Sequence, residues 1–273
     1  MVSQEDRDRA TQLAIEAARK DLLCYILLMD PTFSVGPHHR VMCDKLMSLY
    51  AGDIDRLMLF MPPRTSKSRV ASIFFPAWTL GHHPHWHVLG ASHSDDLAVY
   101  FGRGVRNMIQ SPQHQIVFPD CKVRPDIRAA DEWATTAGGE FTAAGVGTGI
   151  AGRGATLASI DDPLSEQDAW SDTARRAVNE WYTGGLRTRL MPGGRISITQ
   201  TRWHETDLSG TLLEAQLKDS LADKWTVVEF PAINTSYSLP TLQEARTKLI
   251  AQGLLPADSQ ELRLDESFWP APG

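Results

Sequence analysis

The sequence predicts an α/β fold in which helices flank a mostly parallel sheet. Short runs of β-type residues alternate with helical stretches along the chain, and each run stops near a Gly, Pro, Asp or Ser. Such alternation is typical of parallel sheets, because each crossover between parallel strands needs a helix-length connection. The expected strands cover residues 57–60, 86–90, 157–160, 195–200 and 225–230.

Helical periodicity places helices around these strands. Apolar residues recur at helical spacing over residues 6–29, which predicts an N-terminal helix before the core. Further helices are expected over residues 67–80, 95–110, 172–190 and 208–217, with a kink at Pro76 in the first and an interruption at Gly184-Gly185 in the third. After Asn234 the periodicity weakens and prolines accumulate, which predicts a linker.

The composition is that of an ordinary globular protein. The 273 residues are 42% hydrophobic and 22% charged, enough for one large α/β domain or two small ones. The net charge of −6 excludes a global basic field for nucleic acid, so any contact with a polyanion must be local. Cys24, Cys43 and Cys121 lack metal-ligand spacing and predict reduced thiols. With no apolar run of about 20 residues and no signal peptide after Met1, we expect a soluble protein that is not exported.

The octamer Met61-Pro62-Pro63-Arg64-Thr65-Ser66-Lys67-Ser68 resembles the phosphate loop G-x-x-x-x-G-K-[ST] of P-loop NTPases. In such a loop, backbone N–H groups at a helix N-terminus surround phosphates, the Lys neutralises phosphate charge and the hydroxyl reaches Mg²⁺. The Lys-Ser pair is present, whereas Met61 and Ser66 stand where glycines are usual. Taken alone, the octamer fits either a nucleotide loop or a Pro-rich turn before a helix.

Two adjacent carboxylates end a buried-strand pattern in the run Leu157-Ala158-Ser159-Ile160-Asp161-Asp162. A Walker B segment has this pattern, because it places acidic groups at the C-terminal edge of a sheet beside the phosphate loop. In that arrangement Asp161 would hold Mg²⁺ together with Ser68. Asp162 would orient or deprotonate the attacking water, and Glu166 is a further candidate for this base. A lone Asp-Asp-Pro more often starts a turn that caps a helix.

An alternating pattern over residues 195–200 predicts a strand whose end carries polar groups. The candidates are Thr199, Gln200 and Thr201. In many P-loop motors a polar residue at the end of the corresponding strand contacts the γ-phosphate and reports its hydrolysis to the rest of the fold. His204, which follows, has no second His or Cys at ligand spacing, so packing and a surface hydrogen bond are expected of it rather than metal binding.

A Gly-rich stretch over residues 145–154 contains one arginine, Arg153, just before the Asp161 strand. Glycines let the backbone approach a phosphate or a neighbouring subunit closely. An arginine in such a loop can reach a γ-phosphate across a subunit interface and stabilise its charge. The alternative is a solvated loop arginine.

Taken in order, four segments resemble the ATPase half of the large terminase subunit of tailed bacteriophages, the motor that pumps DNA into procapsids. The segments are PPRTSKS, VLGASHSDDLA, GTGIAGRGATLASIDDP and EWYTGGLRTRLMPGGRISITQTRWHETDLSG. The resemblance runs from about Gly36 to Phe230, and IDDP combined with TRWHETDL at this spacing is specific. It implies a RecA-like, additional-strand P-loop fold that uses ATP and Mg²⁺.

The resemblance divides the chain into an N-terminal helical extension or lid (residues 1–50), a P-loop ATPase core (51–233) and a C-terminal subdomain or linker (234–273) toward a nuclease domain. Large terminases carry a C-terminal nuclease with metal-binding carboxylates. The sequence ends before any such region, so DNA cutting is not expected of these residues.

The resemblance also implies roles for individual residues. The expected ATP-binding residues are Pro63, Arg64, Thr65, Ser66, Lys67, Ser68 and Arg69. The other assignments are Ser68 and Asp161 to Mg²⁺, Arg64 to phosphate sensing, Asp162 to catalysis, Arg153 to a trans-acting arginine finger, and Thr199, Gln200 and Thr201 to coupling.

Two of these positions depart from the family pattern. Many terminases carry a catalytic Glu where this chain has Asp162, so the shorter acid must reach through a different geometry. Relatives also have Gly where this chain has Ser66, and a side chain there must accept an unusual backbone angle, at a cost of about 1 kcal/mol, or reshape the loop. Weak or slow ATP turnover is therefore a hypothesis for this chain.

The sequence thus predicts the ATPase motor domain of a viral large terminase, which couples ATP hydrolysis to translocation of double-stranded DNA into a procapsid. The alternative is a nucleotide-binding assembly module that hydrolyses little or no ATP because of its altered loop. A RecA-like helicase half is disfavoured, because the second core expected of helicases is missing and they lack the TRWHETDL context.

The implied partners are double-stranded DNA, the portal protein, the small terminase subunit and further copies of this chain. Those copies would form a ring, expected to be a pentamer when docked, whereas the chain can be monomeric in solution. The expected location is the host cytoplasm, with transient binding to the procapsid. The candidates for DNA contact are Arg103, Arg106, Arg124, Arg128, Arg187 and Arg189, although a solvated surface position is the commoner role for each.

Overall fold

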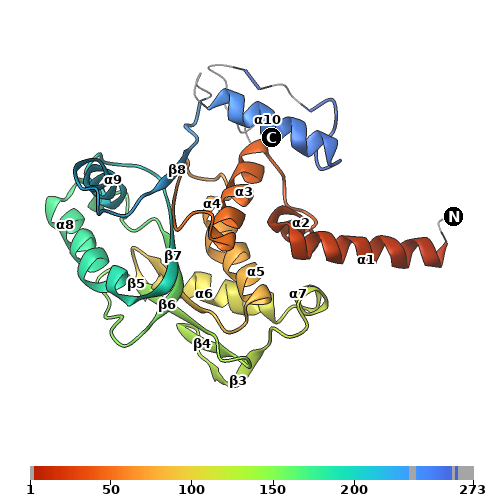
Figure 1. Cartoon of the computed structure of the whole chain (residues 1–273), viewed down its shortest axis with the longest axis horizontal. Coiled ribbons are helices and arrows are strands. Elements are labelled where there is room, and N and C mark those ends of the chain that lie inside the picture. Colours follow the sequence, from red (N-terminus) through yellow and green to blue (C-terminus); the bar gives the residue numbers. More distant parts are fainter. Residues whose placement is uncertain (1–2, 234–237, 260–261, 264–273) are drawn as a thin grey trace.

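A computed structural model describes residues 3–233, 238–259 and 262–263 of the chain. In this part, helices cover both faces of an eight-stranded sheet with the strand order β3-β4-β5-β2-β6-β7-β1-β8 (Figure 1). The β3–β4 and β4–β5 ladders are antiparallel, and the others are parallel. The mostly parallel α/β sheet predicted from the sequence is therefore confirmed.

All five expected strands are present, with shifted ends. They are β1 (Arg56–Phe60), β2 (His87–Ser92), β6 (Ala155–Asp161), β7 (Leu190–Gln200) and β8 (Thr226–Glu229). Three strands at the other edge of the sheet were not predicted: β3 (Val123–Arg128), β4 (Glu132–Thr135) and β5 (Glu140–Gly145). Their signal is weak, because β3 is half-exposed and charged and β5 is rich in small residues.

The strand order places β7 between β1, which leads into the phosphate-loop octamer, and β6, which ends at Asp161. This is the additional-strand arrangement that the resemblance implies. Side chains alternate between the two faces of β1, since Leu57 and Leu59 pack into one core cluster and Met58 and Phe60 into another. The sheet is thus buried on both sides.

One face of the sheet packs against the N-terminal helices and the helices that follow β1 and β2. These are α1 (Gln4–Lys20), α2 (Leu22–Met29), α3 (Pro37–Ala51), α4 (Lys67–Arg69), α5 (Phe75–His82), α6 (Asp95–Ile109) and α7 (Pro112–Val117). The other face packs against α8 (Asp172–Glu180) and α9 (Leu208–Lys218). Helix α1 projects away from the sheet, and most of it is exposed (Figure 1).

The N-terminal helix predicted over residues 6–29 is two helices. The backbone of Asp21 is extended, which ends α1, and the Asp21 side chain caps α2 by accepting a hydrogen bond from the Cys24 N–H at 3.0 Å. The periodicity continues across this break because both helices bury apolar residues in the same core.

Two other predicted helices change type along their length. The helix after the phosphate loop becomes a π-helix over Val70–Phe74, so its irregularity lies just before Pro76, which occupies the first turn of α5. The interruption expected at Gly184-Gly185 is confirmed, since α8 gives way to a π-helix over Trp181–Leu186 and then to a 3₁₀ turn over Arg187–Arg189.

The C-terminal region contains a helix that was not predicted. Helix α10 (Leu239–Ala251) lies beside α3 and buries Leu242, Ala245 and Leu249 (Figure 1). The linker expected after Asn234 is therefore wrong for this segment. No helix in the described ranges combines the length and apolar character that a membrane span requires.

Candidate active site

The phosphate-loop octamer, Asp161-Asp162 and the 199–201 segment meet at one edge of the sheet. They follow β1, β6 and β7, which are neighbouring parallel strands, so their C-terminal ends lie side by side. Ligands of open parallel sheets bind at this edge, in the crevice beyond the strand ends. Three of the four sequence signals therefore converge, although they are spread over about 140 residues of the chain.

Two residues of the phosphate-loop octamer, which contains no glycine, adopt the left-handed backbone conformation. Ser66 adopts a left-handed conformation, with φ 60° and ψ 12°, and Lys67 begins α4 directly after it. Arg64 is left-handed as well, with φ 65°. Alternation of left-handed and right-handed residues turns successive N–H groups toward one concave side, where they can bind phosphate. Each non-glycine residue in this conformation costs about 1 kcal/mol.

Hydrogen bonds from several elements fix the loop. Within it, the Thr65 hydroxyl donates to the Pro62 carbonyl at 3.0 Å. At its start, the Met61 N–H donates to the Gln200 carbonyl at 3.2 Å, and the Thr201 hydroxyl donates to the Met61 carbonyl at 3.3 Å. The loop is therefore tied to the end of β7.

A cavity of about 390 Å³ lies beside the loop. Its walls are Arg64, Ser66, Lys67, Ser68 and Arg69 on one side and Ile73, Tyr100 and Phe101 on the other. Arg69 is held at its rim by an ion pair with Asp30 of 2.7 Å. The cavity combines cations with an exposed aromatic ring, a lining that suits a phosphorylated ligand with an aromatic base.

Lys67 and Asp162 form an ion pair inside this site. Lys67 is 6% exposed, and its Nζ lies 3.3 Å from Oδ2 of Asp162. The other carboxylate oxygen of Asp162 accepts the Thr201 N–H at 2.7 Å. The Asp162 backbone has φ 38°, and its N–H donates to the Thr199 carbonyl at 2.8 Å. Asp162 is thus fixed facing the phosphate loop.

Asp161 lies behind Asp162, at the buried end of β6. The pKa of Asp161 is raised to about 7, because burial and the Asp162 carboxylate, which raise it, outweigh the Ser68 hydroxyl, Lys67 and the Ser72 hydroxyl, which lower it. Oδ1 of Asp161 has no hydrogen-bond partner among the described residues. A buried carboxylate oxygen beside a serine hydroxyl is a donor pair that suits Mg²⁺, which binds hard oxygen ligands.

A magnesium site here would need ligands from outside the protein. Within residues 3–233, 238–259 and 262–263, no group of three or more His, Cys, Asp or Glu side chains is placed to hold a metal. Magnesium is usually bound by one or two protein groups, with water and substrate phosphates completing its shell. Ser68 and Asp161 fit that pattern.

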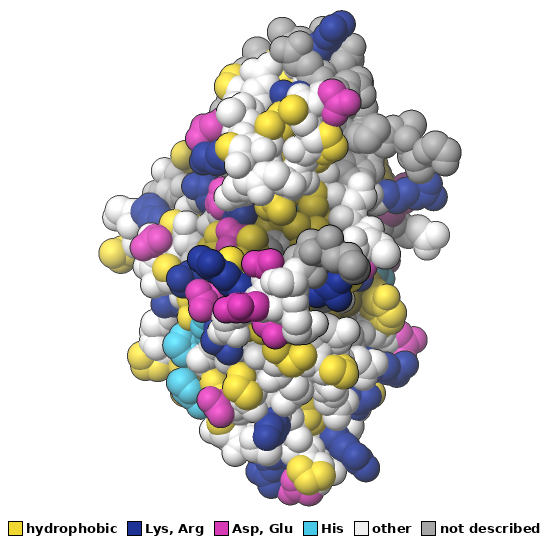
Figure 2. Space-filling view, turned by 90° about the vertical axis from the view of Figure 1, so that its right-hand side faces the viewer, with side chains coloured by type: hydrophobic (Ala, Val, Ile, Leu, Met, Phe, Trp, Pro, Cys, Tyr) yellow, Lys and Arg dark blue, Asp and Glu magenta, His cyan; other side chains and the backbone are white. Residues whose placement is uncertain are grey.

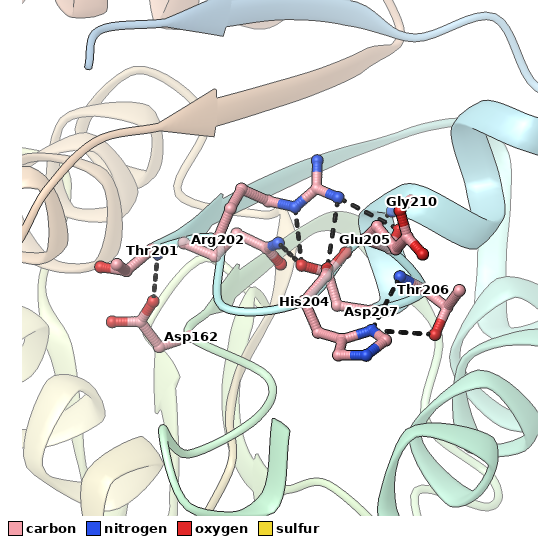
Figure 3. A network of polar contacts seen from close by, with 9 residues as sticks. Asp162, Thr201, Arg202, His204, Glu205, Thr206, Asp207 and Gly210 are labelled. Atoms are coloured by element: carbon pink, nitrogen blue, oxygen red, sulfur yellow. Dashed lines mark hydrogen bonds and ion pairs between the residues drawn. The ribbon is translucent and has the colours of Figure 1, made fainter. Parts of the chain in front are cut away.

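The end of β7 is joined to helix α9 through Asp207, which the sequence analysis did not single out (Figure 3). Asp207 is 4% exposed, and its Oδ2 accepts hydrogen bonds from the Gln200 amide at 2.9 Å and the Arg202 guanidinium at 2.6 Å. Its Oδ1 accepts the Gly210 N–H at 2.8 Å and so caps α9. The Gln200 side chain is therefore directed at Asp207, whereas Thr201 faces Asp162.

The other residues of the 199–206 segment have simpler surroundings. Thr199 is buried, and its carbonyl accepts the Asp162 N–H. Nδ1 of His204 accepts the Thr206 N–H at 3.1 Å, which is the surface hydrogen bond expected of this histidine (Figure 3).

Arg153 and Glu166 lie apart from this constellation. Arg153 precedes β6, so the length of a seven-residue strand, about 20 Å at the usual rise, separates it from Asp161. Its Nη1 pairs with Oε1 of Glu132 at 2.5 Å and donates to the Thr142 hydroxyl at 3.4 Å. Glu166 is exposed, and no hydrogen bond or ion pair in the described ranges joins it to Lys67 or Asp161.

Three of the six arginines proposed for DNA contact pair with other groups of the chain. Those with partners are Arg106 on the Arg128 carbonyl, Arg124 on Asp126, and Arg187 on Asp223, the last through two hydrogen bonds. Arg103 is exposed on α6. On the face shown in Figure 2, basic and acidic side chains are interspersed. The arrangement favours local contacts over a broad basic surface.

No family model matches the chain, and no curated protein matches it. Among solved structures, the HK97 bacteriophage large terminase is similar, with 14% identity and a TM-score of 0.48 over 86% of this chain and 51% of that one. The Thermus phage P74-26 large terminase ATPase domain is similar at 15% identity and a TM-score of 0.42, and an arginine-to-alanine variant of it at 14% and 0.44. Each of these two matches covers 78% of this chain and 88% of the other. The chain spans about half the length of the HK97 protein.

Proposed function

We propose that this chain is the ATPase motor domain of a viral large terminase, which hydrolyses Mg·ATP to move double-stranded DNA into a procapsid. The observation that supports this most strongly is the convergence of Lys67, Asp161 and Asp162 beside a loop that turns through two left-handed residues and leads into a helix. The ordered motifs that resemble large terminases give the ATPase its proposed biological role.

In the proposed site, the loop N–H groups and the Lys67 ammonium bind the β- and γ-phosphates. Arg64, which lines the cavity, would sense the terminal phosphate. Ser68 and Asp161 would hold Mg²⁺, which supplies positive charge that stabilises the phosphate oxygens during transfer. The base would lie toward Tyr100, the exposed ring at the far wall.

Hydrolysis in this proposal depends on Asp162. Water forms a bond to the γ-phosphorus while the bond between that phosphorus and the bridging oxygen of ADP breaks, and Asp162 orients the water and takes its proton. The Lys67 ammonium now pairs with Asp162 at 3.3 Å. When a bound phosphate attracts Lys67 away from Asp162, Oδ2 of Asp162 becomes available to water.

Coupling would start at the same carboxylate. Its hydrogen bond to the Thr201 N–H connects the reacting centre to the end of β7, and the Gln200 and Arg202 contacts with Asp207 continue to α9. DNA would be bound without sequence preference, so its affinity should fall steeply with salt. The portal protein, the small terminase subunit and a ring of copies remain the proposed partners.

Steady-state ATPase assays at high protein concentration test the proposal, with Lys67→Ala and Arg153→Ala as variants. If the chain is a motor, the unmodified protein should hydrolyse ATP, and Lys67→Ala should abolish this turnover. Arg153→Ala should lower it only at concentrations where the chain assembles. Mg·ATP binding without turnover in the unmodified chain would favour a nucleotide-binding assembly module. Absence of Mg·ATP binding in the unmodified chain would contradict both.

A further inference from the structure

Two buried histidines of α3 converge on one carbonyl of the phosphate loop. Nε2 of His39 lies 3.1 Å from the Thr65 carbonyl oxygen, and Nε2 of His38 lies 3.3 Å from the same atom. Both side chains are 0% exposed, and their rings are in contact, with centroids 3.9 Å apart. Helix α3 lies within residues 1–50, where a helical extension is expected, but nothing in the sequence predicts its contact with the Thr65 carbonyl, 26 residues further along the chain than His39.

The hydrogen-bond pattern fixes how the rings are protonated. A carbonyl oxygen only accepts hydrogen bonds, so Nε2 of each ring must carry a proton. Nδ1 of His39 accepts the Gly36 N–H at 2.9 Å, so this nitrogen is bare and the ring is neutral. Burial agrees with this, since it lowers the pKa of His39 to about 4 and, together with the neighbouring His39 ring, lowers the pKa of His38.

The carbonyl direction determines the direction of the next N–H. The peptide bond between Thr65 and Ser66 is planar and trans, so the Ser66 N–H points opposite to the Thr65 carbonyl. With the carbonyl turned toward α3, this N–H is turned away from α3. Ser66 lines the cavity beside the loop, and its N–H is one of those that a phosphate loop offers to its ligand.

Two left-handed residues flank this carbonyl. Arg64 and Ser66, at φ 65° and φ 60°, surround Thr65, and both have side chains that disfavour this conformation. A loop with glycine at these positions adopts such angles without strain. Here the two hydrogen bonds from α3 are available to offset the strain.

We propose that His38 and His39 are positioning residues of the phosphate loop, which hold the Thr65 carbonyl toward α3 and so keep the Ser66 N–H directed at bound phosphate in a loop without glycine. This rests on the proposed nucleotide site, and it assigns the N-terminal region the task of shaping that site. The ligand class is the phosphate chain of Mg·ATP.

Rigid packing gives α3 the means to do this. The Phe33 ring packs edge-on against His39, at 4.8 Å between centroids. Arg40, the next residue of α3, forms an ion pair with Asp21 at 2.8 Å, which ties α3 to the start of α2. The histidines are therefore held by a helix that is itself fixed in the core.

The first test uses the unmodified chain. ¹⁵N NMR of the histidine rings at pH 7 distinguishes a protonated from a bare ring nitrogen. The proposal requires a proton on Nε2 of both rings. It also requires that Nδ1 of His39 carry no proton. Protonation on Nδ1 alone in either ring would overturn it for that residue, and this result does not depend on how any variant folds.

The second test compares variants in the absence of nucleotide. The side-chain amide of Gln places an N–H near the position of Nε2. The double variant His38→Gln/His39→Gln should therefore keep the loop amides protected from exchange, whereas the double variant His38→Leu/His39→Leu should not. Amide exchange of residues 64–68 should rise by about tenfold in the Leu variant, as expected for the loss of two hydrogen bonds. His114→Leu is the matched control, because His114 is equally buried but bonds the Tyr25 hydroxyl at 2.7 Å, away from the loop.

Mg·ATP binding measured in parallel separates the two proposals. If loop amides exchange faster in the Leu variant but the unmodified chain does not bind Mg·ATP, the histidines still shape the loop and the proposed nucleotide site is overturned. If the unmodified chain binds Mg·ATP but loop amides exchange equally fast in the Leu variant and in His114→Leu, only the role of the histidines is overturned. Weaker binding in the Leu variant that the Gln variant restores supports both.

Discussion

Asp162 and Lys67 form an ion pair, with Oδ2 of the carboxylate 3.3 Å from Nζ of the ammonium. The same carboxylate accepts the Thr201 N–H at 2.7 Å. One side chain therefore contacts both the lysine proposed to bind phosphate and the segment proposed to report hydrolysis. The Asp162 backbone has φ 38° directly after β6, at the residue whose side chain pairs with Lys67.

Replacing Asp162 by Asn should stop hydrolysis and spare binding. The amide cannot accept a proton from water, so kcat should fall by about 10²–10⁴-fold, the usual contribution of a general base. The Kd for Mg·ATP should change far less, because Lys67 and the loop remain. Single-turnover hydrolysis and equilibrium binding measure the two quantities.

Glu166→Gln distinguishes the two candidate bases. Because Glu166 is exposed and does not contact Lys67 in the described chain, we expect its kcat to stay within about threefold of that of the unmodified protein. A loss in Glu166→Gln as large as in Asp162→Asn would move the base to Glu166.

Replacing Ser66 by Gly should relieve strain in the phosphate loop. The left-handed backbone at φ 60° costs a non-glycine residue about 1 kcal/mol, so Mg·ATP binding should tighten by up to about fivefold and kcat should change. Ser66→Ala is the control, because it keeps the Cβ atom and loses only the hydroxyl. Unchanged affinity and unchanged kcat in Ser66→Gly would remove Ser66 as a cause of slow turnover.

Much of the fold could be predicted from the sequence because its central strands are apolar and end in turn residues. The contact of α3 with the loop could not, because His38, His39 and Arg40 are polar residues that are nevertheless buried. Partners distant in the sequence, Thr65 for the histidines and Asp21 for the arginine, contribute to satisfying their hydrogen bonds. Such pairing is invisible to periodicity.

The candidate site divides in the same way. Lys67, Asp161 and Asp162 could be predicted because each follows a recognisable strand at a known edge of the sheet. Asp207 could not, since it stands in a polar segment and its role depends on Gln200, which reaches it only in the folded chain. The Glu132 partner of Arg153 lies in a strand that the sequence did not reveal.

Asp161 should make the protein less stable as pH rises. The pKa of Asp161 is about 7 in the folded protein and about 4 in the unfolded chain, so the folded state binds more protons between these values. The free energy of unfolding should therefore fall from pH 4 to pH 7, by an amount on the order of 3 kcal/mol from this group. Asp161→Asn should lose that part of the pH dependence.

Urea unfolding in EDTA at several pH values measures this effect. Without divalent cations, Asp161→Asn should be more stable than the unmodified protein at pH 7.5, and the difference should vanish near pH 4. Asp96→Asn, an exposed acid on α6, is the control and should follow the unmodified protein. Parallel curves for all three proteins would contradict the prediction.

Asp207→Ala should destabilise the fold, because it removes the helix cap of α9 and leaves the Arg202 guanidinium and the buried Gln200 amide without their acceptor. The expected loss in free energy of unfolding is about 3 kcal/mol. Asp207→Asn should lose less, since Asn is also a good cap, but its neutral amide pairs more weakly with Arg202. Equal stability of the Ala and Asn variants in urea unfolding would show that the α9 cap contributes little.

Arg153 should matter only between subunits. Its guanidinium is paired with Glu132 at the surface, in a contact between side chains that are 35% and 41% exposed. Such pairs contribute about 1 kcal/mol or less, so a phosphate of a neighbouring subunit could compete for the arginine.

Arg153→Ala should leave the Kd for Mg·ATP of the dilute chain unchanged and lower kcat only at concentrations where sedimentation shows assembly. Glu132→Gln, which releases the arginine without removing it, should keep or raise kcat in the assembled state. Equal losses in dilute and assembled Arg153→Ala would indicate a role within its own subunit instead.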